Sequence, residues 1–113
     1  MFSKLKRLPD LPQPGRHRFS LRSISPIPSP LDPRKPAIEF QFGDGTCAIS
    51  KVTGAYLRAN ESLEKLLESM LGRRIVVGEE IDLEAFVGKL FEVVVAAKGD
   101  HGVTIASVRP VAE

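Results

Sequence analysis

Three arginines near the start of the chain have the spacing of side chains on one face of a β-strand. Arg18, Ser20 and Arg22 alternate with the apolar residues Phe19 and Leu21, and Arg16 lies two residues before Arg18. Side chains two residues apart in a strand point to the same side of a sheet. The guanidinium group joins a permanent charge to a planar fork of donors that matches phosphate oxygens. Residues 16–24 therefore predict a half-buried strand whose outer face contacts phosphate groups.

Four further side chains are predicted to extend this surface. Lys51 belongs to a later strand, Arg58 follows that strand, and Lys98 lies at the tip of the last predicted hairpin. Tyr56 lies in an exposed segment before the helix, where two roles stay open: its ring could stack on a base or cap the fold. The predicted nucleic-acid-binding residues are Arg16, Arg18, Arg22, Lys51, Tyr56, Arg58 and Lys98.

No pattern in the sequence indicates catalysis. His17 and His101 lack a nearby Cys or Glu at metal-ligand spacing. Cys47, in a predicted strand without a base partner, is interpreted as a small apolar core residue. The acidic run at 79–84 lacks the alternating ligands and glycine of a calcium loop, so we interpret it as helix capping. We expect no catalytic residue, no metal, no cofactor and no enzymatic activity.

Length and charge limit the class of protein. A chain of 113 residues predicts one domain with a modest core. Residues 1–36 contain eight basic and two acidic residues, a net charge of +6, whereas residues 37–113 have a net charge of −4. This asymmetry indicates a polyanionic partner for one face, and a solvated basic tail is the alternative for the first eight residues.

Hydrophobic patterning and cysteine usage predict where the protein resides. No apolar run approaches the roughly 20 residues of a membrane-spanning helix, and prolines follow the first basic residues where a secretion signal would need an apolar core. One cysteine excludes an internal disulfide. We therefore expect a cytoplasmic protein that does not enter a membrane.

The elements that must position the basic residues can be read from periodicity. Asn60 is the predicted N-cap of an amphipathic helix that Gly72 ends. A Gly-Asp-Gly turn at 43–45 predicts a hairpin. The predicted strands are residues 16–24, 37–42, 46–53, 90–97 and 103–108, with the helix between the third and the fourth and a short turn capped by Asp82 before the fourth.

Prolines divide the chain. Eight of the nine prolines lie within residues 9–36, and proline lacks the amide donor that helices and central strands need. We predict an extended, Pro-rich, basic arm over residues 1–15 and a folded domain over residues 16–113. Residues 25–36 are predicted to form an extended, mobile loop.

The order of three strands, one helix and two strands predicts a mostly-β protein with a five-stranded barrel of the oligonucleotide/oligosaccharide-binding (OB) type. The sequence also resembles small single-stranded DNA-binding proteins of phages and mobile elements that have this fold. Order and spacing carry the resemblance over residues 14–110. The matching segments are PGRHRF at 14–19, KPAIEFQF at 35–42, SLEKLLE with LG at 62–72, LEAFVGK at 83–89 and VTIASVRP at 103–110.

The resemblance implies a non-enzymatic protein that coats single-stranded DNA during replication or recombination. It also implies a dimer or higher homo-oligomer that works beside replication or recombination proteins. The chain departs from the family in ending at Val111-Ala112-Glu113 without an acidic tail, and in the net acidity of residues 37–113. The alternative hypothesis is an assembly module of a phage or transposon complex, in which the Pro-rich N-terminal segment docks on a protein partner.

Overall fold

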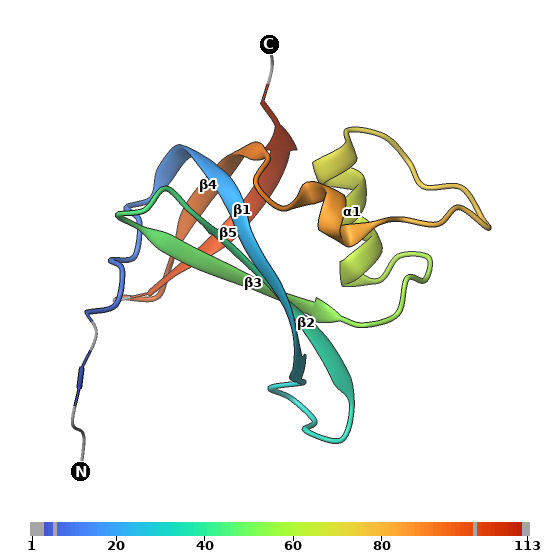
Figure 1. The fold of residues 1–113 in the computed structure, drawn as a ribbon, viewed down its shortest axis with the longest axis horizontal. Coiled ribbons are helices and arrows are strands. Elements are labelled where there is room, and N and C mark those ends of the chain that lie inside the picture. The colour runs from blue at the N-terminus through green and yellow to red at the C-terminus, as the bar shows by residue number, and fades with distance from the viewer. Residues whose placement is uncertain (1–3, 6, 101, 112–113) are drawn as a thin grey trace.

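The computed structural model describes residues 4–5, 7–100 and 102–111, and within them it contains one five-stranded antiparallel sheet and one α-helix (Figure 1). Hydrogen-bonded neighbours in the sheet follow the order β3-β2-β1-β4-β5. The predicted order of elements is confirmed. The elements are β1 (Gly15–Pro28), β2 (Pro36–Gly43), β3 (Ala48–Gly54), α1 (Ser62–Leu71), the 3-10 helix η1 (Leu83–Phe86), β4 (Leu90–Lys98) and β5 (Gly102–Pro110).

The first strand is longer than predicted, because part of the Pro-rich segment at 25–36 continues it. Pro26 and Pro28 both pair with β2 in the register. The Ser29 amide donates to the Lys35 carbonyl across the same pair, at 2.9 Å. Backbone nitrogens of successive strand residues point to opposite sides, so the nitrogens of Pro26 and Pro28 point away from β2. On that side β4 pairs only with the first half of β1. Proline is tolerated at such an edge because no ladder bond is lost, so the predicted loop shrinks to residues 29–35.

A β-bulge at Arg22 keeps both halves of β1 facing the core. Leu21 pairs with Phe42 and Ser23 with Gln41, which leaves Arg22 as the extra residue. One inserted residue shifts the period-two alternation. Leu21 therefore points inward before the bulge, and Ile24 packs against the core after it.

The helix ends as predicted and begins differently. Gly72 has a left-handed φ of 73°, and its amide donates to the Glu68 carbonyl at 2.9 Å, as a glycine C-cap does. The predicted N-cap, Asn60, is wrong: Glu61 occupies that position without a capping side-chain bond, and Asn60 lies one residue earlier with φ 63°. The backbone amide of Asn60 instead donates to the carboxylate of Glu64 at 3.1 Å. The side chain that caps this end of the helix therefore comes from its first turn.

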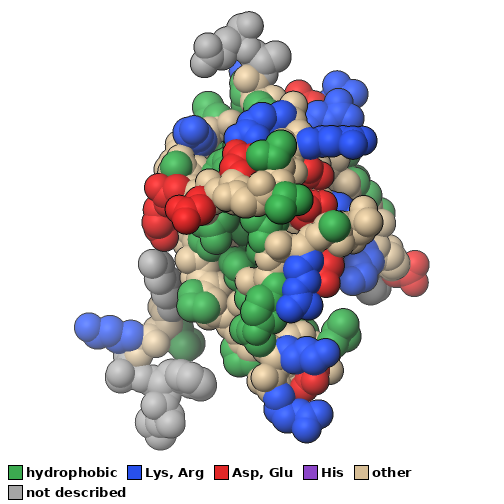
Figure 2. Space-filling model, turned by 90° about the vertical axis from the view of Figure 1, so that its right-hand side faces the viewer, with side chains coloured by type: hydrophobic (Ala, Val, Ile, Leu, Met, Phe, Trp, Pro, Cys, Tyr) green, Lys and Arg blue, Asp and Glu red, His purple; other side chains and the backbone are tan. Residues whose placement is uncertain are grey.

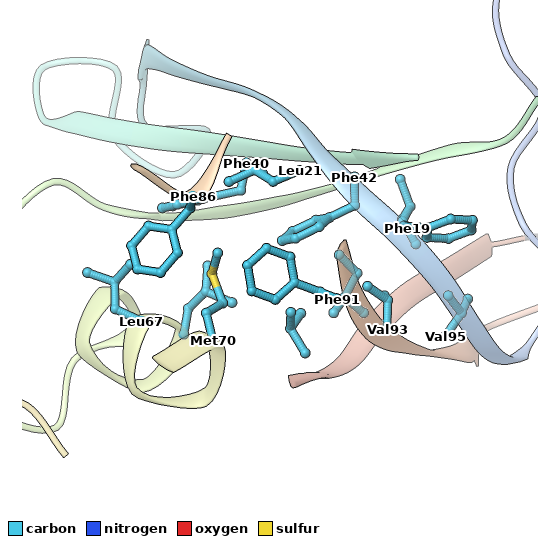
Figure 3. Close-up of a cluster of buried hydrophobic side chains, with 14 of the residues drawn as sticks. Phe19, Leu21, Phe40, Phe42, Leu67, Met70, Phe86, Phe91, Val93 and Val95 are labelled. Atoms are coloured by element: carbon cyan, nitrogen blue, oxygen red, sulfur yellow. The ribbon is translucent and has the colours of Figure 1, made fainter. Parts of the chain in front are cut away.

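The core lies between the concave side of the sheet and α1 (Figure 3). Aromatic rings from β1, β2, β4 and η1 fill its centre. The Phe42 and Phe91 rings pack edge to face, with their centroids 6.1 Å apart, which is a favoured arrangement for aromatic pairs. The helix adds Leu63, Leu66, Leu67 and Met70, all buried. Along β1, β2 and β4 the apolar residues recur with the period-two alternation of a strand, and those on the inner side are buried, as this pattern predicts. They are Phe19, Phe40, Phe42, Phe91, Val93 and Val95.

The sheet is strongly curved, and its two edge strands approach each other at the helix. α1 contacts both β3 and β5, and these strands also contact each other. No hydrogen-bonded ladder joins β3 to β5 in the described part of the chain. The structure therefore shows a mostly-β fold with an open five-stranded sheet and one helix. No helix in the described ranges is long and apolar enough to cross a membrane.

Gly43, at the end of β2, packs against the backbone of the turn that leads into β3, and a substitution there tests this contact. A Cβ at Gly43 would lie 2.6 Å from the Cys47 carbonyl oxygen, whereas a Cβ at Gly54 would meet no atom within 4 Å. We expect Gly43→Ala to lower the free energy of unfolding by about 1–3 kcal/mol, as overpacking does. Gly54→Ala is the matched control and should change it by less than about 1 kcal/mol. Urea denaturation measures both, and equal effects would contradict the predicted clash.

Candidate nucleic-acid interface

The outer face of β1 carries the first two predicted arginines side by side. Arg16 and Arg18 are exposed and lie opposite Val94 and Glu92 of β4. Neither arginine forms an ion pair within 4.0 Å among the described residues. Their guanidinium groups therefore remain available to a phosphate in solution.

A cross-strand row limits how strongly basic this face is. Glu92 lies between Arg18 on one side and Arg109 of β5 on the other in the strand register. Side chains directly opposite each other in antiparallel strands approach within about 4.5–5.5 Å at Cβ. The carboxylate thus offsets one of the two guanidinium charges, and the row keeps a net charge of +1.

The third arginine lies farther along β1, in a groove with a basic residue that the sequence analysis did not select. Arg22 and Arg7 both line a hollow of about 470 Å³. One wall is the segment that begins at Arg7, and the opposite wall is the turn between β2 and β3. Gln41 adds an amide to the lining. Arg7 Nη2 lies 3.1 Å from Asp10 Oδ1 in an ion pair, whereas Arg22 forms no ion pair within 4.0 Å among the described residues. The Arg22 guanidinium is therefore the group in the groove that is available to a phosphate.

The N-terminal segment forms this wall because it is fixed to the sheet at several points. Asp10 makes a parallel bridge to Cys47, and its carbonyl accepts from the Ala48 amide at 3.0 Å. Pro12 is buried, and His17 Nε2 donates to the Gln13 carbonyl at 2.6 Å. The described part of the predicted arm therefore lies against the domain at these residues.

The opposite wall is held by Asp44. Its carboxylate accepts the backbone amides of Cys47 and Thr46, each at 2.9 Å. These bonds hold the pKa of the Asp44 carboxyl below its usual range. The ionised Asp44 carboxylate therefore stabilises the folded state at any pH above the pKa of the unfolded chain. This stabilisation is lost as pH falls through the lower pKa of the folded state.

The turn should therefore loosen in acid. We expect the Thr46 and Cys47 amide resonances to move together, with a midpoint below the roughly pH 4 of an ordinary aspartate, because protonation weakens both bonds. A pH series of ¹H–¹⁵N spectra measures this. Asp44→Asn should abolish the transition, and an unchanged transition in that variant would assign it to another group.

Tyr56 and Arg58 form a separate pair in the loop between β3 and α1. The tyrosine side chain is exposed, and the Arg58 guanidinium carbon lies 4.9 Å from the ring centroid. One ring face thus has a cation–π partner. This loop leaves β3 at Gly54, which pairs with Ala37 at the end of the hairpin opposite the Gly43 turn. The pair is therefore separated from the groove by the length of β3.

The two predicted lysines lie on different parts of the molecule. Lys98 is exposed at the end of β4, beyond the pairing of Val95 with Gly15, and so lies at the same end of the sheet as Arg16. Lys51 pairs with Phe40 and shares the inward parity of its neighbours on β3. Lys51 does not lie on the face that holds the arginines.

The structure thus gathers three predicted arginines along β1, with Lys98 at one end, and places the other predicted residues elsewhere. The residues missed from the sequence are Arg7 and Gln41 in the groove. Arg7 was visible only as one member of a basic terminal cluster. The bridge from Asp10 to Cys47 spans 37 positions of sequence, and no local pattern indicates it.

No family model matches the sequence, and no match was found among curated proteins or among solved structures. Among the described residues, no three His, Cys, Asp or Glu side chains are grouped where they could hold a metal ion. Inference about function therefore depends on the fold and its charged surfaces.

Proposed function

We propose that this protein binds single-stranded DNA along the outer face of β1. The observation that carries the proposal is the line of exposed arginines, Arg16, Arg18 and Arg22, that leads into the groove shared with Arg7. Phosphates would lie along this line, and charge rather than base identity would dominate recognition. Lys98 would extend the contact at one end of the strand.

The proposed fold family is the OB barrel. The element order, the central position of β1 between β2 and β4, and the helix beside the two sheet edges support it. In this proposal β3 and β5 close the barrel over α1. Tyr56, with Arg58 on its ring, would offer a second contact to a longer strand by base stacking.

The proposed biological setting is replication or recombination of a phage or mobile element, in the cytoplasm, with the protein acting as a homo-oligomer and not as an enzyme. Its support is the sequence resemblance together with the asymmetric charge. A protein that coats a strand needs no catalytic group; it needs repeated phosphate contacts and neighbouring copies.

Fluorescence anisotropy with one labelled oligonucleotide, prepared as a single strand, as a duplex and as RNA, tests the proposal. We expect tighter binding of the single strand than of the duplex, with affinity that falls steeply with salt because phosphate contacts release counterions. Binding that is absent at low salt, or that does not depend on salt, would overturn it.

A second candidate function is a protein-interaction module. Leu5, Leu8 and Leu11 recur at a spacing of three in the sequence and are 83%, 78% and 60% exposed. Exposed leucines in a Pro-rich segment suit an apolar groove on another protein.

Replacing Leu5 and Leu11 with serine separates the two candidate functions, because it leaves every charge in place and also keeps Leu8, which lines the groove. If the segment docks on a protein or a second copy, the variant loses that association in sedimentation while DNA affinity is retained. Unchanged association would reject the interaction module.

A further inference from the structure

A slot between the two sheet edges contains unpaired positive charge. It has a volume of about 180 Å³ and lies where β3 and β5 approach each other beside α1. Lys51 of β3 and Lys65 of α1 line it, together with the hydroxyl groups of Ser62, Ser69 and Ser107. Leu66 and β5 supply its apolar floor.

Strand parity explains why Lys51 is directed into the slot. Its neighbours on the same side of β3, Ile49 and Thr53, are buried, and Lys51 itself is half-buried. The stem of Lys51 is thus partly covered, and its ammonium group lies on the side of β3 that faces the slot. An anion in the slot would be attracted to this charge.

The helix does not supply such an anion. Neither lysine forms an ion pair within 4.0 Å in the described part of the chain. The carboxylate of Glu64 accepts from the Asn60 amide at 3.1 Å, and that of Glu68 accepts from the Ile75 amide at 2.8 Å. Both acids are thus engaged on the loops at either end of α1, and neither lines the slot.

The serines give the slot directed donors. Ser62 has a fixed position because its Oγ accepts from the Gly54 amide at 3.3 Å, and its hydroxyl hydrogen remains free to donate. Two ammonium groups and three hydroxyls form a donor set suited to phosphate oxygens. The volume lies below the roughly 300–1,000 Å³ of pockets for drug-sized ligands, which favours a small ligand group.

We propose that the slot formed by Lys51, Lys65 and the three serines binds a phosphate group. This inference goes beyond the proposed function, because the slot is separate from the arginine face and would bind phosphate whether or not that face binds DNA. The phosphate could belong to a small phosphorylated metabolite or to the end of an oligonucleotide, and the experiment distinguishes the two sources.

The test is a ¹H–¹⁵N titration of the full chain, at constant ionic strength, with inorganic phosphate, ribose 5-phosphate and an oligonucleotide with or without a 5′-phosphate. We expect saturable shifts at the Lys51, Ser62, Lys65 and Ser107 amides with inorganic phosphate. A preference for the 5′-phosphorylated oligonucleotide identifies a strand end as the source. A preference for ribose 5-phosphate identifies a metabolite.

Variants establish that the lysines are responsible. Lys51→Met and Lys65→Met keep the apolar stems, and each should weaken phosphate binding about tenfold, as loss of a charged hydrogen bond does. Lys89→Met removes an exposed lysine outside the slot and should change nothing. Lys65 is exposed, so its variant remains informative if Lys51→Met fails to fold.

Absent shifts, shifts spread over all surface lysines, or equal losses in the control variant would overturn the site. The outcome is independent of the arginine face: phosphate shifts without oligonucleotide binding would reject the proposed function and keep the slot. Oligonucleotide binding without shifts at the slot residues would keep the proposed function and reject the slot.

Discussion

Phe42→Ala is expected to lower the free energy of unfolding by about 3–5 kcal/mol, the range for a large buried aromatic side chain. Phe42 has no exposed surface, and its ring packs edge to face on the Phe91 ring with the two centroids 6.1 Å apart (Figure 3). The substitution removes the transfer free energy of the ring and leaves a cavity between β2 and β4 that the curved sheet cannot close. Since total stability is typically about 5–15 kcal/mol, much of the variant could be unfolded.

Urea denaturation followed by circular dichroism measures this loss as a shift of the midpoint. The control is Leu31→Ala, which removes an apolar side chain that is 97% exposed in the loop between β1 and β2. The control should change stability by less than about 0.5 kcal/mol. Comparable losses in the two variants would show that the core is not centred on Phe42.

Local patterns in the sequence predicted much of the fold. The inward phenylalanines follow from period-two alternation, which each strand imposes by its own geometry. The end of α1 follows from Gly72, because glycine reaches a left-handed φ without the usual steric cost. Such features depend on a few adjacent residues, so a single sequence contains enough information to place them.

The errors occurred where tertiary pairing outweighs local preference. Proline argues against a strand, yet Pro26 and Pro28 belong to β1, since one partner strand suffices and the other edge is free. Asn60 is a good N-cap by type, yet the loop that enters α1 gives it a left-handed φ and moves the cap position to Glu61. At the prolines the conformation is set by pairing with β2, and at Asn60 it is set by the adjacent loop and by the bond to Glu64.

The candidate site was predictable in part for the same reason. Arg16 and Arg18 share a face because they share a strand. The meeting of Arg22 with Arg7 depends on how the N-terminal segment lies against the hairpin turn. Lys51 was assigned to the outer face, and its pairing with Phe40 shows inward parity instead. A register must be known before such a residue can be assigned to a side.

The helix side of the molecule carries charges of both signs (Figure 2). Lys and Arg side chains there are interspersed with Asp and Glu, and hydrophobic side chains gather between them (Figure 2). Arg73 is paired with Glu79, with Nη1 3.0 Å from Oε1, and this pair raises the pKa of Arg73 and lowers that of Glu79. Interspersed charges of both signs attract a polyanion weakly.

Neutralising the three arginines of β1 is expected to have the largest effect on DNA binding. The variant carries Arg16→Gln, Arg18→Gln and Arg22→Gln, and glutamine keeps a polar side chain of similar length at these exposed positions. Exposed charge contacts contribute up to about 1 kcal/mol each, so we expect affinity for a single strand to fall roughly 10- to 100-fold. The slope of log affinity against log salt should decrease by about 2, or roughly 0.7 for each lost phosphate contact on a single strand.

The matched control removes the same net charge elsewhere, through Arg34→Gln, Lys35→Gln and Arg74→Gln, all at exposed positions. The two variants have the same net charge, and charges farther from the bound strand than the Debye length of about 10 Å at 0.1 M salt contribute little to affinity. Only direct contacts distinguish the two variants. Anisotropy across a salt series should therefore give the control nearly the wild-type slope. Equal losses of slope in the two variants would mean that the strand follows no defined line of arginines, and the outer face of β1 would cease to be the interface.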